Sequence, residues 1–530
     1  MTDLVIEQTS TELQGPSDKE KKYDRQLRIW AAQGQQALEH ADILLINSGS
    51  GAVGVEILKN LVLPGTLVHS PSVQMKNPTN RLQADFGVNF FLEESSLGKS
   101  RAECCVKFLQ ELNHDVSGEF HSTLSVPYLQ SLFGMRCFSF ILCTLPVEAD
   151  ILSTLKEQST KTKIPLILTH SVGFYSYFRS ILPVTIPIVE THHETEATTD
   201  LRLLNPWKEL SDYSAALTKD IEKLSDFKHG HIPYISLLLH FLKDWKRTHG
   251  RYPNSYAEKI EFRKKIIAGS RKSLEGTEEN FDEAVAAVLK NIKIPMLSSD
   301  AREVFEYQTN DIEANSSFWI ISDAVKQFYE KNEQLPLPGS VPDMKAESMI
   351  YIQLQNIYKT KARQDAIEVF ETVLQHPNGK SIKLVDVENF CKNAAHIKLI
   401  HASNEAATDL GAIAKSEFEN DEVSKITSQP LSLLPIYLAL NAISHVPTAS
   451  ASDIISRVEK DVPIAASNDR VHKVAQEVAR AKGGELHNIS AITGGMVAQE
   501  VIKIVTRQYT PIDNTCIFDG ITSRVQVMRI

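Results

Sequence analysis

The chain has 530 residues, more than one hydrophobic core usually covers, so two or three domains are expected. Its 42% hydrophobic and 23% charged residues are ordinary for a soluble globular protein, and a net charge of −10 argues against a general nucleic-acid binder. The six cysteines form no Cys-x-x-Cys pair, which favours a reducing compartment over a disulfide framework. No signal peptide is visible, and no apolar run approaches the roughly 20 residues of a membrane span. We therefore expect a soluble intracellular protein.

The N-terminal part of the chain predicts a helix, a buried strand, a glycine-rich turn and a second helix. Residues 1–20 are expected to form a mobile tail, and residues 21–39 have an amphipathic helical pattern. The apolar run 43–46 suits a strand buried on both faces. Gly49, Gly51 and Gly54 then follow at the spacing Gly-x-Gly-x-x-Gly, before a helical pattern that ends at Pro64-Gly65.

The rest of the chain predicts an α/β domain interrupted by a helical one. The expected elements are strands at 67–69, 138–143, 164–169, 515–518 and 524–530, with helices at 97–112, 147–158 and 489–507. Their alternation indicates a doubly wound, mostly parallel Rossmann-like sheet. Helical patterns dominate from 183 to 482. We therefore expect residues 21–182 and 483–530 to form one α/β domain, with 183–482 as a large, mainly helical insert.

The glycine turn, residues 47–54, has the form of a phosphate-binding loop, because backbone N–H groups and a helix N-terminus meet there. A dinucleotide-dependent oxidoreductase would carry an acidic residue about twenty positions further on, to bind the ribose. Val68, His69 and Ser70 stand there instead, and no Asp or Glu occurs between Glu56 and Asp85. This disfavours an oxidoreductase, and the lack of a following Lys-Ser/Thr pair excludes a P-loop.

Other catalytic patterns receive little support. The chain contains no H-E-x-x-H and no G-x-S-x-G motif. The stretch His192-His193-Glu194 and the pair His229/His231 are interpreted as polar loops, because no partner shows the spacing of a metal site. The cysteines have no neighbours that would obviously stabilise a thiolate, so buried structural thiols are expected.

Four motifs, taken in order, resemble one family. They are YDRQLRIW at 23–30, EILKNLVLPG at 56–65, LGKSRAE at 97–103 and ITGGMVAQEVIKI at 492–504. Together they resemble the adenylation half of ubiquitin-activating-type enzymes, which have a ThiF/MoeB-like fold. These enzymes adenylate the C-terminus of a ubiquitin-like protein and capture it as a cysteine thioester. Within this family, LPLPGSVPDMKAESMIYIQLQNIY at 335–358 is similar to a segment typical of the regulatory subunits of heterodimeric neddylation activating enzymes.

The resemblance implies that this chain has a degenerate, pseudo-adenylation site. A competent site in the family needs an aspartate for the ribose, an arginine and a lysine for the phosphates, and an aspartate for Mg²⁺. Here the ribose aspartate is missing, the arginine becomes Val88, the lysine becomes Arg101 and the magnesium aspartate falls at Leu145. The register of Val88 rests on the stretch 89–91, in preference to a second match at 80–81. The insert also lacks the family's cysteine segment, so we expect no catalysis by this chain alone.

The resemblance also implies partners and one catalytic contribution. The degenerate half of such a pair donates the arginine of its Tyr-x-Arg-Gln motif, here Arg25, to the ATP phosphates of the active half. The expected partners are a catalytic subunit, the ubiquitin-like neddylation modifier and, through the complex, a conjugating enzyme. ATP and Mg²⁺ would be bound by the catalytic subunit, and this chain would bind no cofactor. The expected location is the cytoplasm and nucleus. No nucleic-acid or membrane partner is expected.

Three alternatives remain at this point. The regulatory subunit of a SUMO-activating enzyme shares the α/β motifs, but the stretch 335–358 and the long insert disfavour it. An NAD-dependent oxidoreductase is disfavoured by the missing ribose acid. The third alternative is a pure scaffold. It differs from the favoured interpretation only in that Arg25 makes no contribution to catalysis.

Overall fold

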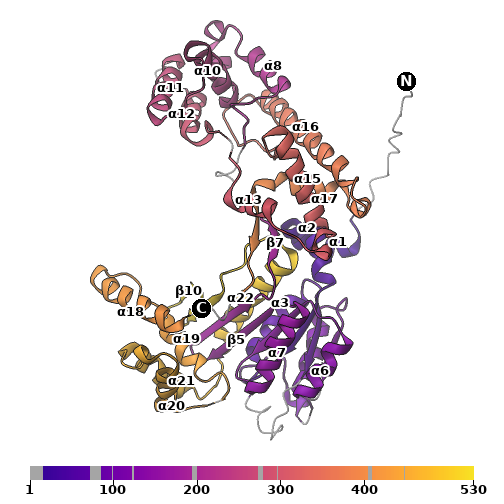
Figure 1. The fold of residues 1–530 in the computed structure, drawn as a ribbon, viewed down its shortest axis with the longest axis vertical. Helices are drawn as coiled ribbons and strands as arrows, with labels where there is room; N and C mark the ends of the chain where they lie inside the picture. Colours follow the sequence, from indigo (N-terminus) through magenta and orange to yellow (C-terminus); the bar gives the residue numbers. More distant parts are fainter. Residues whose placement is uncertain are drawn as a thin grey trace. The chain divides into compact units, whose positions relative to one another are not determined.

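The computed structural model describes residues 16–71, 85–97, 99–121, 124–193, 200–271, 278–294, 296–403, 409–446 and 448–530. Contacts divide the chain into two compact units, one formed by Met1–Ile186 with Ile400–Ile530 and the other by Pro187–Leu399. The first unit contains the sheet and both ends of the described chain (Figure 1). Each unit is described by itself below.

The first unit is built on an eight-stranded sheet with the order β10-β9-β6-β5-β4-β1-β2-β3. Its strands are β1 (Asp42–Ile46), β2 (Leu67–Pro71), β3 (Gly118–His121), β4 (Phe140–Thr144), β5 (Leu166–Val172), β6 (Tyr175–Ile181), β9 (Thr515–Asp519) and β10 (Arg524–Met528). The strands from β5 to β3 pair in parallel, whereas β6, β9 and β10 are antiparallel. The predicted doubly wound, mostly parallel sheet is thus confirmed, with an antiparallel extension.

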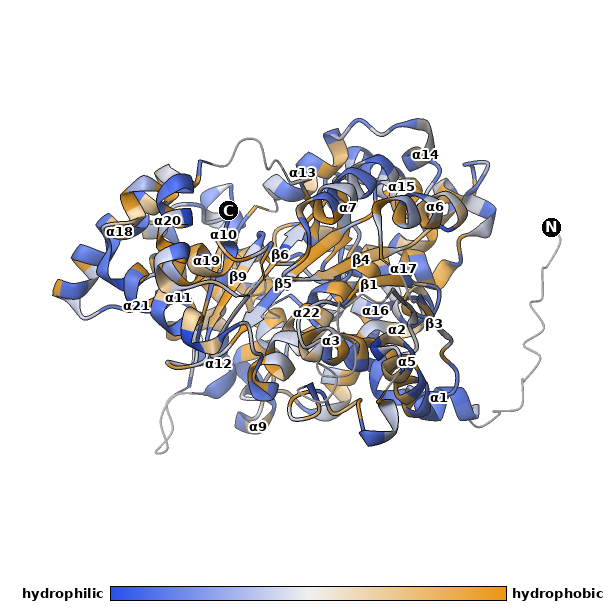
Figure 2. Cartoon of the chain, turned by 90° about the horizontal axis from the view of Figure 1, so that it is seen from below, coloured by the Kyte–Doolittle hydropathy of each residue, from blue (hydrophilic) through white to orange (hydrophobic). Residues whose placement is uncertain are grey.

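Helices cover both faces of this sheet, so its central strands are buried on both sides. The helices of the unit are α1 (Asp18–Lys22), α2 (Asp24–Glu39), α3 (Ala52–Val62), α5 (Arg101–Leu112), α6 (Val126–Met135), α7 (Ala149–Thr162), α18 (Leu410–Thr427), α19 (Leu434–Asn441), α20 (Ala451–Asp461), α21 (Asp469–Ala481) and α22 (His487–Thr506). Figure 2 shows α3, α5 and α22 on one side of the sheet and α6 and α7 on the other. Residues 43–46 of β1 are fully buried, as their apolar run predicts.

The second unit is mainly helical and has two hydrophobic cores. Its helices are α8 (Lys208–Leu217), α9 (Asp226–His229), α10 (Tyr234–His249), α11 (Tyr256–Gly269), α12 (Glu279–Asn291), α13 (Ser299–Glu306), α14 (Asp311–Ala314), α15 (Ser317–Asn332), α16 (Ser348–Val373) and α17 (Leu384–Lys392). A two-stranded sheet of β7 (Ile186–Val189) and β8 (Ile397–Ile400) forms where the chain enters and leaves the unit. The stretch 335–358, which carries the resemblance to the regulatory subunits, contributes to the core of this unit. Its Tyr358 is fully buried and donates a hydrogen bond to the Leu201 carbonyl at 2.7 Å.

The C-terminal border of the helical unit differs from the expected one. Residues 400–482 belong to the sheet-containing unit, whereas the helical pattern had assigned them to the insert. The physical reason is packing: Leu434, Leu438 and Val471 belong to the same hydrophobic core as Ile141 and Leu168 of the sheet. A helix that covers a sheet and a helix that covers other helices both show an apolar stripe, so periodicity cannot separate them.

The N-terminal segment also differs in detail from the expectation. Helix α1 begins at Asp18, inside the expected tail, because Ser17 and Glu20 form a capping box. The expected helix 21–39 becomes α1 and α2, and α2 is interrupted where Ala31 has φ of 54°. The remainder of the expected tail, residues 1–15, lies outside the described residues.

Helix α22 is the central helix of the unit and packs closely on α3. By length and composition it could span a membrane, contrary to the expectation from the sequence, but 61% of its most apolar window is buried inside the protein. Its closest approach is at Gly494, where an added Cβ would lie 2.7 Å from Glu56 Cβ and 2.9 Å from the Ile57 nitrogen. The glycine therefore sets the distance between the two helices.

This contact gives a prediction with a control on the adjacent residue. Gly494→Ala should destabilise the protein by about 1–3 kcal/mol, because α3 and α22 must move apart. At Gly495 an added Cβ meets nothing within 4 Å, so Gly495→Ala should be neutral or stabilising by up to about 1 kcal/mol. Thermal unfolding of both variants tests this, and equal midpoints would contradict the close approach.

Candidate functional site

The glycine turn lies at the carboxyl end of β1, between β1 and its parallel neighbour β4. The chain leaves β1 into α3 on one face of the sheet and leaves β4 toward α7 on the other (Figure 2). This change of face is the position at which doubly wound proteins usually bind nucleotides. The turn has the left-handed backbone that glycine permits, with φ of 63° at Gly49 and 77° at Gly51.

The amide side of the turn is occupied by a carboxylate of the same chain. Glu485 accepts a hydrogen bond from the backbone N–H of Val53 at 2.7 Å, in the first turn of α3. The hydroxyl of Ser50 donates to its other oxygen at 2.7 Å, and Ser490 donates at 2.8 Å. Glu485 is 7% exposed. A fixed negative charge thus sits at the N-terminus of α3, where the helix dipole favours one.

The carbonyl side of the turn is occupied by Arg101. Its guanidinium donates to the carbonyl oxygens of Gly49 at 2.7 Å and Asn47 at 3.0 Å, and to the Asp85 carboxylate at 3.2 Å. Arg101 is 7% exposed. The cation that the family resemblance aligns with a phosphate-binding lysine is therefore engaged by the backbone of its own chain.

These internal side chains account for the glycine spacing. A Cβ at Gly51 would lie 2.9 Å from Arg101 Nε, and one at Gly54 would collide with the Asn47 side chain. A Cβ at Gly49 would lie 3.3 Å from Glu485 Oε1. The glycines therefore leave room for the chain's own side chains.

The structure brings the other predicted degenerate positions to the same place. Val88 accepts a hydrogen bond through its carbonyl from His487 Nδ1 at 3.1 Å, next to the start of α22. Leu145 follows β4 and is 5% exposed, and its carbonyl lies 3.9 Å from the position of a Gly49 Cβ. Neither side chain can bind a phosphate or a metal. The side chains at 68–70 and the alternative match at 80–81 lie outside the described part.

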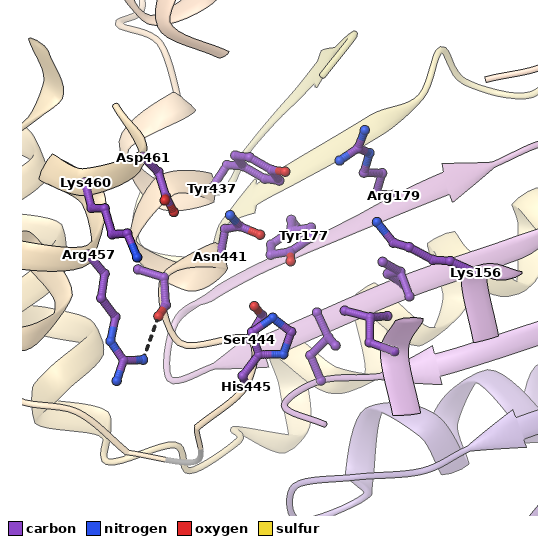
Figure 3. A pocket seen from close by; sticks show the side chains of 14 residues that line it. Lys156, Tyr177, Arg179, Tyr437, Asn441, Ser444, His445, Arg457, Lys460 and Asp461 are labelled. Atoms are coloured by element: carbon purple, nitrogen blue, oxygen red, sulfur yellow. Dashed lines mark hydrogen bonds between the residues drawn. The ribbon is translucent and has the colours of Figure 1, made fainter. Parts of the chain in front are cut away.

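A cavity of about 340 Å³ lies beside Leu145 on the α7 side of the sheet (Figure 3). Its charged lining consists of Lys156, Arg179, Arg457, Lys460 and Asp461. Figure 3 shows Arg457 and Lys460 on one side and Lys156 and Arg179 on the other. The lining therefore carries more positive than negative charge, which disfavours a divalent cation in this cavity.

The histidines singled out in the sequence are engaged in structural contacts. Buried His229 lies 2.7 Å from Glu278 through Nδ1 and stacks on Phe281, and His193 stacks on His396 with ring centroids 3.8 Å apart. Glu194 lies outside the described residues. Among the residues that the structure describes, no group of three or more His, Cys, Asp or Glu side chains could hold a metal ion.

The cysteines are mostly buried thiols, as predicted, with Cys137 as an exposed exception. Burial raises the pKa of Cys105 and of Cys143 to about 12. Burial also raises the pKa of Cys391 and, together with the nearby Glu500, that of Cys516. These four side chains are therefore protonated at neutral pH and are poor nucleophiles.

Arg25 lies apart from the glycine turn, on the first part of α2. Its side chain is exposed and has no hydrogen bond or ion pair to any described residue, whereas Arg28 on the same helix pairs with Asp24 at 3.0 Å. An unpaired arginine can reach outward to an anionic ligand without first breaking an internal contact. Arg25 is thus exposed on the first unit and makes no hydrogen bond or ion pair with this chain's own glycine turn.

The segment that carries Arg25 is anchored at both ends. Tyr23 is 2% exposed, and its hydroxyl accepts a hydrogen bond from Asn113 Nδ2 at 3.0 Å. Trp30 is 8% exposed, and its carbonyl accepts from Gln508 Nε2 at 2.9 Å. These contacts fix the backbone on either side of Arg25 while the guanidinium itself stays exposed.

Comparison with known proteins places the whole chain among one set of relatives. The ThiF family model matches residues 23–530. The NEDD8-activating enzyme E1 regulatory subunit of Xenopus laevis is 34% identical over 95% of this chain and 97% of that protein. Its Danio rerio counterpart is 33% identical over 96% and 98%, and the AXR1 subunit of Arabidopsis thaliana is 31% identical over 96% of each. Among solved structures, E. coli MccB covers 31% of this chain at a TM-score of 0.26 and 15% identity, too little to support an inference.

The buried Arg101 gives a stability prediction. Arg101→Met should cost about 3–5 kcal/mol, because it removes the buried cation that pairs with Asp85 and bonds two turn carbonyls. Arg136→Met removes an arginine that makes a more exposed pair with Glu119 at 2.8 Å, so it should cost only about 0–1 kcal/mol. Denaturant unfolding compares the two, and equal losses would contradict the role of Arg101 in the turn.

Proposed function

We propose that this chain is the non-catalytic subunit of a heterodimer that activates NEDD8. The premise is that the chain belongs to the ThiF family and, within it, to the NEDD8-activating enzyme E1 regulatory subunits. A catalytic subunit would bind ATP and Mg²⁺, adenylate the modifier and capture it on a cysteine. This chain would complete the ATP site of that subunit with Arg25.

One observation carries this proposal: the exposed Arg25 and the filled glycine turn occur in the same unit. Glu485 bonds the Val53 amide and the Ser50 hydroxyl, and the guanidinium of Arg101 is bonded to turn carbonyls, so both charged groups at the turn are engaged within the chain. The cation that remains exposed and unpaired in the Tyr-x-Arg-Gln motif is Arg25. An arginine on an anchored helix can stabilise charge that develops on a phosphate bound by another chain.

The surface around α2 and α22 supports a protein partner. The two helices pack against each other, and Ile29 on α2 and Ile492 on α22 are 46% and 49% exposed. Phe90 is 68% exposed and stacks on His487 at the start of α22. Large exposed apolar side chains on neighbouring elements are typical of an interaction surface. We assign this surface to the catalytic subunit.

The remaining parts of the proposal follow from the same assembly. A conjugating enzyme would be reached through the complex and not through this chain alone. Six free cysteines support a reducing compartment, and the proposed location is the cytoplasm and nucleus. Neither a SUMO-activating role nor an oxidoreductase role is supported by the names of the relatives.

The proposal predicts a specific effect of one arginine. Arg25→Ala should slow modifier adenylation by the heterodimer by roughly 10²-fold or more, because one donor to the transition-state charge is lost. Heterodimer formation should be unchanged, since the exposed apolar side chains assigned to the partner surface, Ile29, Ile492 and Phe90, stay in place. The measurements are single-turnover thioester formation and co-purification of the two subunits.

Arg28→Ala is the matched control, because Arg28 is exposed on the same part of α2 and pairs with Asp24. It should leave the adenylation rate within about twofold of the native rate, since an exposed pair contributes little. Equal rates for the two variants would remove the role of Arg25 and leave a pure scaffold as the function.

A further inference from the structure

The carboxylate of Glu485 occupies the glycine turn from a distant part of the chain. Glu485 stands just before α22, and its hydrogen bond to Ser50 joins residues 435 positions apart. The local N-cap of α3 is Gly51, which has no side chain and makes no capping hydrogen bond. The cap that the turn lacks locally is therefore supplied by Glu485.

The donors around Glu485 are those that such a turn presents to a phosphate. They are a backbone N–H in the first turn of the helix, at Val53, and the hydroxyl of Ser50 within the turn. The helix N-terminus adds a partial positive charge, which favours an oxyanion. A carboxylate and a phosphate both offer oxygen acceptors with negative charge, so one can replace the other at this position.

We infer that Glu485 is a built-in anion that fills the phosphate position of the glycine turn and closes the turn to external ligands. Two observations besides the helix terminus support this. The side chain is buried and has a third donor in Ser490, and its Oε1 lies within 3.3 Å of the position of a Gly49 Cβ. Arg101 lies on the carbonyl side of the same turn, where its positive charge is paired with Asp85.

The inference concerns a latent site for a compact oxyanion. Removal of the carboxylate would leave a small cavity with the donors of Ser50, Val53 and Ser490 in place and without an acceptor. Unmet donors of this kind are costly, so a small external anion that fits should bind there. The native chain should show no such binding, because its own side chain is already present.

The test is rescue of stability by acetate, used as the probe with the full-length chain at constant ionic strength. Glu485→Ala should lower the thermal midpoint by several degrees, and acetate should restore at least half of the loss in a saturable manner. Inorganic phosphate, tested in parallel, separates an oxyanion site from one that fits carboxylates alone. Glu485→Gln is the matched control, because it removes the charge but keeps the volume, and acetate should not restore it.

Two outcomes would overturn the inference: an equal response of both variants and the native chain to acetate, or no response of Glu485→Ala to either anion. If Glu485→Ala does not fold, the coupling between Ser50→Ala and Glu485→Gln decides. The midpoint loss caused by Ser50→Ala should be smaller in the Glu485→Gln background, and additive losses would contradict the inference. The assay contains neither partner nor ATP, so its failure leaves the Arg25 proposal untouched.

Discussion

The filled glycine turn is the constraint on which the rest of this structure depends. Its amide side is held by Glu485 and its carbonyl side by Arg101, and both groups are buried. Buried backbone polar groups need partners, and charged partners form strong hydrogen bonds. The turn therefore keeps the shape of a nucleotide-binding loop while the Val53 amide and the Ser50 hydroxyl bond a carboxylate of the same chain. This contact joins the two separated segments of the first unit.

This arrangement separates two tasks that an active adenylation fold combines. The sheet, α3 and α22 form a rigid support in which the former phosphate position is closed. The exposed Arg25 is carried on a helix that Tyr23 and Trp30 anchor on either side. Rigid support matters because a donor stabilises a transition state only if it is already in place, without further loss of entropy. In the proposed assembly, the chain would assist catalysis in its partner through Arg25 while its own turn stays closed.

Local patterns in the sequence predicted much of this fold. The buried run of β1, the glycine turn, α3, β4, β5 and α22 follow from short-range hydrophobic spacing, and the family motifs place Val88, Arg101 and Leu145 around the turn. Long-range pairings were not predictable in this way. The contact of Glu485 with Ser50 spans 435 positions, and a lone acid before a helix carries no local signal. The packing of α19 and α21 on the sheet was missed for the same reason.

The central claim is that this chain contributes a residue to the single ATP site of the assembly and contains no ATP site of its own. The most direct measurement is nucleotide stoichiometry by equilibrium dialysis with labelled ATP, on the isolated chain and on the purified heterodimer. The account predicts no saturable binding by the isolated chain and a single nucleotide per heterodimer. Saturable binding by the chain alone, or two nucleotides per heterodimer, would contradict it.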